Sequence, residues 1–539
     1  MSLSEKSSSN LHYIFYAIIL TIGIWIGYYL SSNNPTQGSA KNETQQQVSK
    51  ISDIFNYIHD NYVDSVEYDK LVDDALESIL LHLDPHSNYI PVEDFEFVNE
   101  DMTGKFDGIG IQFRIEKDTV MVIQTIPNGP SEKVGLKAGD RIIEADGKNI
   151  AGVQITNNEV MKMLRGAKGT KVEVRVKRTG IKELLTFTIT RNEIPTFSVD
   201  YSGMITKDIG YIKLSSFKIK SDIEFRDALK KLTDKGLTKL IFDLRGNGGG
   251  SLDACIKIAD QFFDAGVLLV YTEGLHRSRQ DTYSTKQGLF KTGKLVVLVD
   301  EFSASASEII AGAVQDNDRG VIIGRRTFGK GLVQEQIGFR DGSAIRLTVS
   351  RYYTPVGRSI QRNYEKGLEA YYDEFYTRVM DEFQTGDDTS SFDTIQYRTP
   401  KGKIVYGGGG IQPDIHVGYP LIYKNDSLKM YFNMLFQFSF EYTDKNRQRL
   451  LNTYRNADGF IKGFVITPVI WNSYIDFIKK NPADKKQPNP GNLNAEERKF
   501  IEIHLKANIG RNLFDYDGYY PIVKDADEIL QEAIKSFEQ

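Results

Sequence analysis

The stretch Asp243-Leu244-Arg245-Gly246-Asn247-Gly248-Gly249-Gly250 joins a buried apolar run, Lys239–Leu244, to a segment with helical spacing, Ser251–Asp264. Glycines at a strand-to-helix junction let the backbone approach a ligand closely and point its N–H groups inward. The Lys and Ser/Thr of a P-loop are absent, and the dinucleotide-binding spacing does not fit. The stretch can be a purely structural glycine-rich turn, or its backbone N–H groups can donate hydrogen bonds to an oxyanion.

Outward from this stretch, strands are predicted to alternate with helices between Gly210 and Ser350. The predicted strands are Lys239–Leu244, Val267–Tyr271, Leu295–Val299 and Val321–Ile323, and the predicted helices are Ser251–Asp264 and Ala306–Gln315. This alternation is typical of a βαβ-type core with a largely parallel sheet.

A candidate nucleophile lies at the start of the second predicted helix, in Phe302-Ser303-Ala304-Ser305-Ala306-Ser307-Glu308. Ser305 and Glu308 fit a capping box, which taken alone is usually structural. The same geometry would also suit catalysis, because the positive end of a helix dipole and unpaired N–H groups favour a developing oxyanion.

A candidate base follows in Phe328-Gly329-Lys330-Gly331-Leu332-Val333-Gln334. Most lysines are solvated, but a lysine in apolar surroundings loses proton affinity and can take the proton of a serine hydroxyl. Gln334 can hold the amine by accepting a hydrogen bond. The histidines do not offer a comparable pairing in the sequence, since His86 and two others precede the sheet and His276 lies in a polar run. Neither a Gly-x-Ser-x-Gly elbow nor a His-Glu-x-x-His helix is present.

The 539-residue length predicts several folded units. Residues 13–30 carry no charge and are long enough for one transmembrane helix, followed by a polar linker over residues 31–47. Helical spacing covers residues 48–104, and short strands with turn signals cover residues 105–191. We assign residues 192–420 to the α/β core, with an acidic, aromatic helical insertion at about 365–393. Residues 421–539 are predicted to be mainly helical and of unknown role.

Composition excludes some classes of protein. The net charge of −5 gives no reason to expect a nucleic-acid partner. Cys255 is the single cysteine, so the chain has no intramolecular disulfide and no thiolate metal cluster. No metal or cofactor is expected.

Taken together and in order, the motifs resemble those of the C-terminal processing peptidases, or tail-specific proteases. They are Leu83-Asp84-Pro85-His86-Ser87, Gly108-Ile109-Gly110-Ile111, Asp243–Gly250, Ser303–Glu308, Phe328–Gln334 and Gly407–Asp414. The resemblance runs from about Val48 to His416. It implies a crotonase-like α/β protease core with an inserted PDZ domain.

The resemblance also implies roles. Ser305 would be the nucleophile, Lys330 the general base and Gln334 its orienting partner, with Gly249 and Ala306 as oxyanion donors. The family often has proline at the position of Gly248, so the choice between Gly248 and Gly249 stays open. Gly108, Ile109, Gly110 and Ile111 would form the loop that binds a terminal carboxylate.

We therefore expect a serine endopeptidase that recognises exposed apolar C-termini of protein or peptide substrates. The expected location is a bacterial inner membrane, single-pass, with the catalytic part in the periplasm. Two alternatives are a catalytically silent membrane-tethered PDZ scaffold and a crotonase-type acyl thioester enzyme. The physiological substrate, any adaptor and the oligomeric state are left open.

Overall fold

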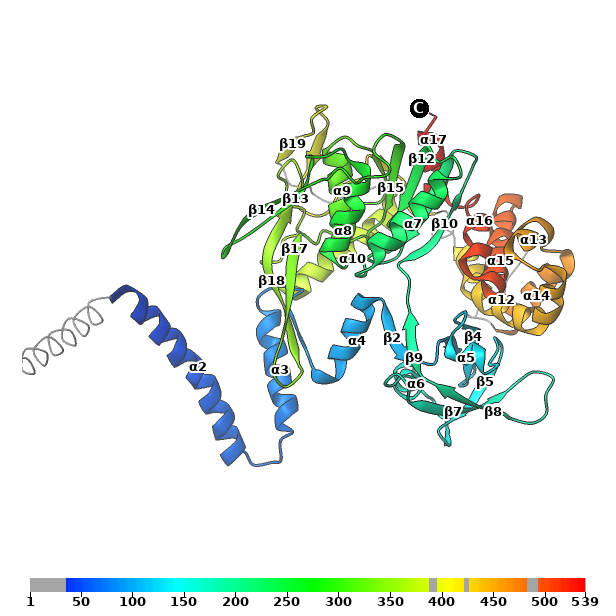
Figure 1. The fold of residues 1–539 in the computed structure, drawn as a ribbon, viewed down its shortest axis with the longest axis horizontal. Coiled ribbons are helices and arrows are strands. Elements are labelled where there is room, and N and C mark those ends of the chain that lie inside the picture. Colours follow the sequence, from blue (N-terminus) through cyan, green and yellow to red (C-terminus); the bar gives the residue numbers. More distant parts are fainter. Residues whose placement is uncertain (1–34, 387–394, 421–425, 482–492, 539) are drawn as a thin grey trace, which may run out of the picture. The chain divides into compact units, whose positions relative to one another are not determined.

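The computed structural model describes residues 35–386, 395–420, 426–481 and 493–538 (Figure 1). The predicted transmembrane segment, residues 13–30, lies outside these residues, as does the start of the predicted linker. Among the residues that are described, we find no helix with both the length and the apolar character needed to cross a membrane.

The chain divides into two units, residues 1–78 and 79–539. In the first, α2 (Pro35–Asn61) is followed by α3 (Tyr68–Leu81), whose last turn belongs to the second unit. The rings of Phe55 and Tyr68 meet edge-on, with centroids 5.8 Å apart. Helix α2 begins inside the segment expected to be a linker, because a stretch without a core-forming pattern can still be rich in helix formers such as Ala, Lys, Glu and Gln.

In the second unit, residues 105–195 form a small β-domain with a sheet of order β3-β4-β5-β7-β8. Strands β2 and β9 pair outside this sheet, Lys105 opposite Pro195, so the domain leaves and rejoins the core at one place, as an inserted domain should. Its strands and helices are β2 (Lys105–Gly108), β3 (Ile111–Ile115), β4 (Val120–Thr125), α5 (Pro130–Lys133), β5 (Arg141–Ala145), β6 (Lys148–Asn149), α6 (Asn157–Leu164), β7 (Lys171–Lys177), β8 (Leu185–Thr190) and β9 (Asn192–Pro195).

The core contains a six-stranded sheet of order β10-β11-β12-β15-β16-β21. Strands β11, β12, β15, β16 and β21 are parallel to one another, whereas β10 pairs antiparallel with β11 at the edge. The predicted, largely parallel sheet is confirmed. Its elements are β10 (Val199–Met204), β11 (Ile209–Leu214), α7 (Ser221–Thr233), β12 (Lys239–Asp243), α8 (Leu252–Ala259), the short 3-10 helix η1 (Asp260–Phe262), β15 (Lys294–Val299), α9 (Ala306–Asp316), β16 (Val321–Gly324) and β21 (Ile415–His416).

The two faces of this sheet are buried by different parts of the chain. Because side chains alternate along a strand, Ile212 and Leu214 of β11 face helices α7, α8 and α9, whereas Ile209 and Tyr211 face the opposite side. That opposite side is covered by the last helix of the chain, α17 (Glu528–Ser536). The C-terminal region therefore supplies one layer of the core.

A second sheet is antiparallel and has the order β1-β18-β13-β14, with β17 also paired to β18. The prediction for Val267–Tyr271 was wrong in part, because this strand (β13) joins the antiparallel sheet. After β13 the chain turns straight back into β14, and a parallel neighbour would need a longer crossover. The members are β1 (Asn88–Ile90), β13 (Leu268–Gly274), β14 (Arg277–Tyr283), β17 (Leu332–Gly338) and β18 (Ala344–Tyr353).

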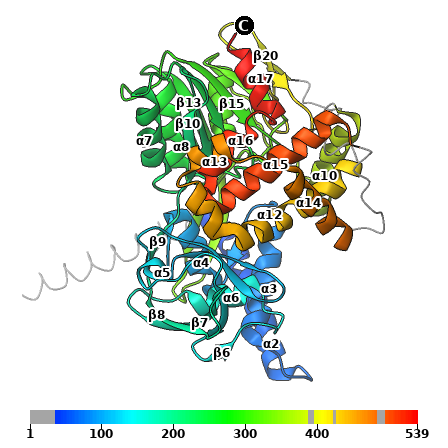
Figure 2. The ribbon, with the colours of Figure 1, turned by 90° about the vertical axis from the view of Figure 1, so that its right-hand side faces the viewer.

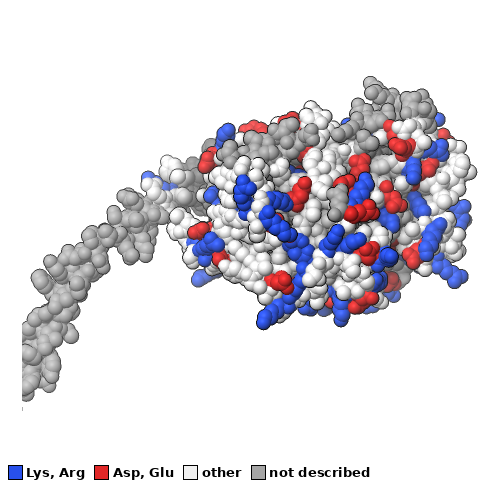
Figure 3. Space-filling model, turned by 90° about the horizontal axis from the view of Figure 1, so that it is seen from above, with Lys and Arg blue, Asp and Glu red and all other residues white. Residues whose placement is uncertain are grey.

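Helices complete the second unit. The predicted insertion contains α10, and the C-terminal region is helical as predicted, with α12, α14 and α15 sharing an apolar core (Figure 2). Basic and acidic side chains are interspersed over the face drawn in Figure 3. The remaining elements are α4 (Val92–Thr103), α10 (Leu368–Thr385), β19 (Gln396–Arg398), β20 (Ile404–Tyr406), α12 (Asp426–Thr453), α13 (Ala457–Gly463), α14 (Pro468–Lys480), α15 (Ala495–Phe514), the 3-10 helix η3 (Asp515–Gly518) and α16 (Tyr520–Val523).

Candidate active site

Ser305 occupies the N-cap position of α9, where the β15 strand turns into the helix. Its backbone has φ 55° and ψ −112°, in the left-handed half of conformational space that a residue with a side chain rarely adopts. Strain of this kind persists only where the surrounding structure enforces it, and it is common at functional sites.

The buried carboxylate of Glu308 fixes the backbones of both candidate residues. One of its oxygens accepts the N–H of Ser305 at 2.8 Å and the N–H of Lys330 at 2.9 Å. The other accepts the N–H of Gly329 at 2.7 Å and the hydroxyl of Thr327 at 2.6 Å. Burial raises the pKa of Glu308 to about 7, although these donors act in the opposite direction. The capping box in the sequence predicts the contact of Glu308 with Ser305, whereas its contact with the lysine loop depends on the fold.

Lys330 and Gln334 make the contact that the sequence predicts. The Lys330 amine donates to Gln334 Oε1 at 2.9 Å. Burial, with the nearby Arg346 cation, lowers the pKa of Lys330, so the neutral form is more accessible than in a solvated lysine. Ser305 and Lys330 line the same cleft, of about 650 Å³, without a hydrogen bond between their side chains. In an enzyme without substrate such catalytic hydrogen bonds are often not yet formed.

His86 is closer to the site than the sequence suggested. Its backbone carbonyl accepts the Gln334 amide at 2.6 Å, and its ring Nε2 lies 3.0 Å from the Tyr371 hydroxyl of α10. Burial and the Lys330 amine lower the pKa of His86 to about 3, so its ring is neutral. The place of His86 in the chain did not predict this contact, since only the fold brings its segment to Gln334. The contact is with the glutamine, through the His86 backbone, and gives the His86 ring no part in a Ser-His pairing.

The glycine-rich turn lies against Ser305. A Cβ atom on Gly249, whose φ is +102°, would stand 2.8 Å from the Ser305 Cβ. The Gly249 N–H, however, donates to Asn247 Oδ1 at 2.9 Å. Within the described chain, the N–H groups of Gly248 and Ala306 have no hydrogen-bond partner. The geometry thus leaves Gly248 and Ala306 free to bind an oxyanion, whereas Gly249 would first have to release Asn247.

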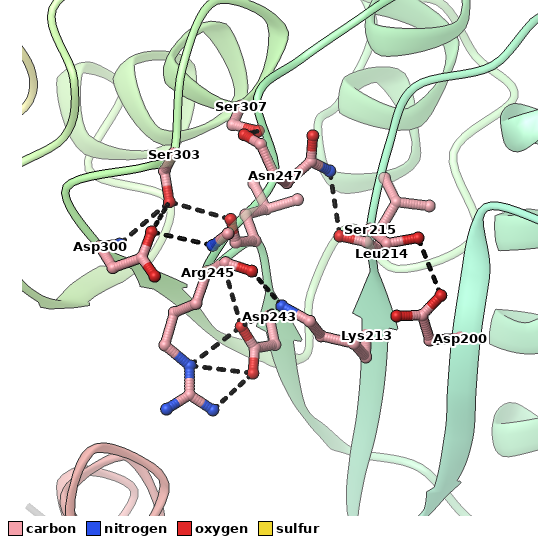
Figure 4. A network of polar contacts seen from close by, with 12 residues as sticks. Asp200, Lys213, Leu214, Ser215, Asp243, Arg245, Asn247, Asp300, Ser303 and Ser307 are labelled. Atoms are coloured by element: carbon pink, nitrogen blue, oxygen red, sulfur yellow. Dashed lines mark hydrogen bonds and ion pairs between the residues drawn. The ribbon is translucent and has the colours of Figure 1, made fainter. Parts of the chain in front are cut away.

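Neighbouring loops hold this turn in place (Figure 4). The Asn247 side chain donates to the Leu214 carbonyl at 3.0 Å, and the Asn247 carbonyl accepts the Ser307 hydroxyl at 2.8 Å. The Ser303 hydroxyl reaches back to the Leu244 carbonyl at 2.9 Å. The glycine-rich turn and the loop that carries Ser305 therefore form one hydrogen-bonded unit.

The cleft beside Ser305 has an apolar wall and reaches helix α4. Its apolar lining comes from residues on four elements and the loop after β11, namely Phe217, Leu252, Ile309, Leu332, Val333 and Tyr352. Asn99 and Met102 of α4 line the same cleft.

The loop Gly108-Ile109-Gly110-Ile111 of the inserted domain lies between β2 and β3. Among the described residues, the N–H groups of Ile109 and Gly110 have no hydrogen-bond partner, whereas the Ile109 carbonyl accepts Ser131. The Ile109 side chain is buried in the domain's own core, so Ile109 offers a ligand its backbone only.

Arg165, at the end of α6, connects this domain to the cleft. Its guanidinium lies 2.5 Å from the Glu100 carboxylate of α4 and stacks over the Phe106 ring. Its partner, the half-buried Glu100, follows Asn99 directly in α4.

Comparison with known families follows the same division of the chain. The models that match are those of peptidase family S41 over residues 208–370, of the PDZ domain over 108–190 and of the "Activating protease CtpB N-terminal domain" over 22–94. A family of unknown function, DUF8443, matches residues 430–515.

Two curated relatives and one solved structure are also similar to this chain. The carboxy-terminal-processing protease of Bartonella bacilliformis is 38% identical over 59% of this chain and 73% of its own length. The protease CtpA of Bacillus subtilis is 32% identical over 66% of this chain and 76% of its own length. A solved photosystem II D1 C-terminal processing protease has 28% identity and a TM-score of 0.34, covering 57% of this chain and 88% of its own.

The chain belongs to the carboxy-terminal-processing proteases of peptidase family S41. It is a serine peptidase with a PDZ domain. Membership of a protease family argues against the two alternatives, a catalytically silent scaffold and an acyl thioester enzyme. The recognition made from the motifs is confirmed, whereas the crotonase-like description of the core stays a prediction.

Proposed function

We propose that this protease cleaves peptide bonds with a Ser305–Lys330 dyad that Gln334 orients. The observation that carries the proposal is the 2.9 Å hydrogen bond from the Lys330 amine to Gln334, in the cleft that Ser305 also lines. A lowered lysine pKa supports it, because a general base has to be neutral before it accepts a proton.

In the first step, neutral Lys330 takes the proton of the Ser305 hydroxyl as its oxygen attacks the substrate carbonyl carbon. The carbonyl oxygen becomes an oxyanion, and the Lys330 ammonium then gives its proton to the leaving amine. This leaves an acyl ester on Ser305 and a neutral lysine. Lys330 next takes a proton from a water molecule whose oxygen attacks the ester carbon. The ester bond to Ser305 then breaks, the Lys330 ammonium returns the proton to the Ser305 oxygen, and the product leaves with a new terminal carboxyl group.

Backbone donors stabilise the oxyanion in this scheme. The Ala306 N–H is one, at the positive end of α9, and the glycine turn supplies the other. Gly248 has a free N–H, and Gly249 becomes available when it releases the Asn247 side chain.

We further propose that the PDZ domain binds exposed, apolar C-termini. The unpaired N–H groups of Ile109 and Gly110 suit a terminal carboxylate, and the β3 edge that begins at Ile111 suits an added peptide strand. Substrate binding would be transmitted to the cleft through Arg165 and Glu100, the contact between the PDZ domain and α4. Deleting Lys105 to Arg191 tests whether the PDZ domain controls cleavage in this way. An unchanged cleavage rate and substrate choice would refute such control.

Residues 13–30 are proposed to anchor the enzyme in a bacterial inner membrane, with the catalytic part in the periplasm. The support is the uncharged apolar run with aromatic residues near its ends. Recovery of the full chain in the soluble fraction after lysis, without detergent, would contradict the anchor.

The substrate proposal is tested with two unfolded proteins that differ only in their last residues, apolar in one and acidic in the other. Quantitative mass spectrometry of the products is expected to give roughly tenfold faster cleavage of the apolar tail. Equal rates would contradict recognition of apolar C-termini. Ser305→Ala should cleave neither protein, which separates the enzyme from a contaminating protease.

A further inference from the structure

One charged side chain of the C-terminal region, Asp527, contacts Arg245, which directly precedes the glycine-rich turn Gly246–Gly250. We call this turn the oxyanion turn, after its proposed role. Asp527 is the N-cap of α17, and its carboxylate accepts the backbone N–H of Leu530 at 3.1 Å. The same carboxylate binds both terminal nitrogens of Arg245, at 2.9 and 2.7 Å. A planar, bidentate pair of this kind fixes the direction of the guanidinium as well as its charge.

Arg245 is held from its other edge by Asp243 at the end of β12. Its Nε lies 3.1 and 3.0 Å from the two carboxylate oxygens, and its Nη2 lies 2.6 Å from one of them (Figure 4). Burial raises the pKa of Asp243, but Arg245 and Lys213 outweigh it and hold that pKa below its usual range. Arg245 is thus clamped between the strand of the core and the start of α17.

The clamped arginine lies at the start of the oxyanion turn. The next residue, Gly246, donates its N–H to Asp300 at 2.8 Å. After it, the Asn247 carbonyl accepts the N–H of Ala304 at 3.0 Å and the hydroxyl of Ser307. A shift of the Arg245 backbone would therefore move both the turn and the loop that carries Ser305.

Aromatic packing secures the same contact. Tyr520 of α16 stacks on Tyr201 with ring centroids 5.3 Å apart and also touches Tyr211 at 5.9 Å. The Tyr211 hydroxyl donates to Asp243 at 2.7 Å. The C-terminal region is thus linked to Asp243 by two routes, one through Tyr520 and Tyr211 and the other through Asp527 and Arg245.

We infer that Asp527 is a positioning residue for the reaction: by holding Arg245 it sets the place of the oxyanion turn, Gly246–Gly250. This gives residues 421–539, to which sequence analysis assigned no role, a part in transition-state stabilisation. The inference rests on the proposed function, since it takes the turn to bind the oxyanion.

Asp527→Asn is the variant that tests it. Asparagine caps a helix about as well as aspartate, so α17 keeps its start, while the charge that pairs with Arg245 is lost. Asp525→Asn, two residues earlier on an exposed side chain, makes the same charge change without touching Arg245 and serves as the matched control.

Three quantities are measured on the full chain: kcat and KM for a fluorogenic peptide, and the affinity for a peptide boronic acid of the same sequence. The boronic acid forms a tetrahedral adduct with a serine, so its affinity reports on the oxyanion site. We expect Asp527→Asn to lower kcat roughly tenfold, to change KM less than about twofold and to weaken the boronic acid roughly tenfold. Asp525→Asn should behave as wild type.

Unchanged kcat and boronic acid affinity in Asp527→Asn, with only a lower resistance to urea, would show a structural contact and overturn the inference. If Asp527→Asn does not fold, Asp527→Ser replaces it, because serine also caps a helix but has no charge to pair with Arg245. A kcat and a boronic acid affinity equal to those of wild type would then overturn the inference. Cleavage retained by Ser305→Ala would instead overturn the proposed function, so the two failures are distinguishable.

Discussion

Replacing Gln334 by glutamate should move the pH dependence of cleavage upward. The change is nearly isosteric, and it places a carboxylate where the amide oxygen now lies 2.9 Å from the Lys330 amine. A negative charge at that distance stabilises the ammonium form and raises the pKa of Lys330. Because the base has to be neutral, a larger part of the enzyme is then inactive at neutral pH.

The expected size follows from the groups around the amine. Burial and Arg346 lower the pKa of Lys330 in the wild type, while Asp84 and Glu308 act in the opposite direction. A new carboxylate in direct contact shifts the pKa of an ionisable partner by about 1–3 units. Taking about 2 units, cleavage at a pH below both pKa values should fall roughly 100-fold and should recover as the pH approaches the raised pKa.

The assay is kcat/KM for a fluorogenic peptide, measured as a function of pH from mildly acidic to alkaline solution. Gln336→Glu, on the same strand and also lining the cleft, is the control for an added negative charge. A loss in Gln334→Glu that is the same at every pH, or an acid limb that moves downward, would refute the reasoning.

Three further changes test separate contacts. Glu308→Gln places an N–H₂ group against N–H donors that now share the carboxylate. The Ser305 or Lys330 backbone should be displaced, and kcat/KM should fall roughly 100-fold. Wild-type activity would mean that the Glu308 carboxylate is not needed to hold these two backbones. Tyr352→Phe removes the hydroxyl that lies 2.5 Å from the Lys330 carbonyl. We expect steady-state kinetics to show a roughly tenfold lower kcat, and an unchanged kcat would mean that this hydrogen bond does not position Lys330. Cys255 is buried and its thiol pKa is raised, so N-ethylmaleimide should label it only in urea; labelling of the native enzyme would contradict the packing of α8.

The sequence predicts best those features that depend on residues close together in the chain. Alternating strand and helix patterns gave the parallel sheet, and the run from Lys330 to Gln334 gave a contact between residues four apart on one segment. The sheet to which β13 belongs depends instead on its partner, β18, which lies far along the chain.

The missed residues share this dependence on distant partners. His86 contacts Gln334 although 248 residues separate them in the chain, and Asp527 contacts Arg245 although 282 residues separate those two. Gly249 was assigned as a donor from a motif, but the engagement of its N–H by Asn247 is a matter of local conformation that residue types do not reveal.

The proposed mechanism requires Ser305 to cleave peptide bonds with Lys330 as its base. The most direct measurement is mass spectrometry of an unfolded protein with an apolar C-terminus, incubated with wild type, with Lys330→Ala and with the exposed control Lys366→Ala. Cleavage by wild type and Lys366→Ala, and none by Lys330→Ala, is the predicted result. Products of unchanged mass and amount from Lys330→Ala would contradict the claim.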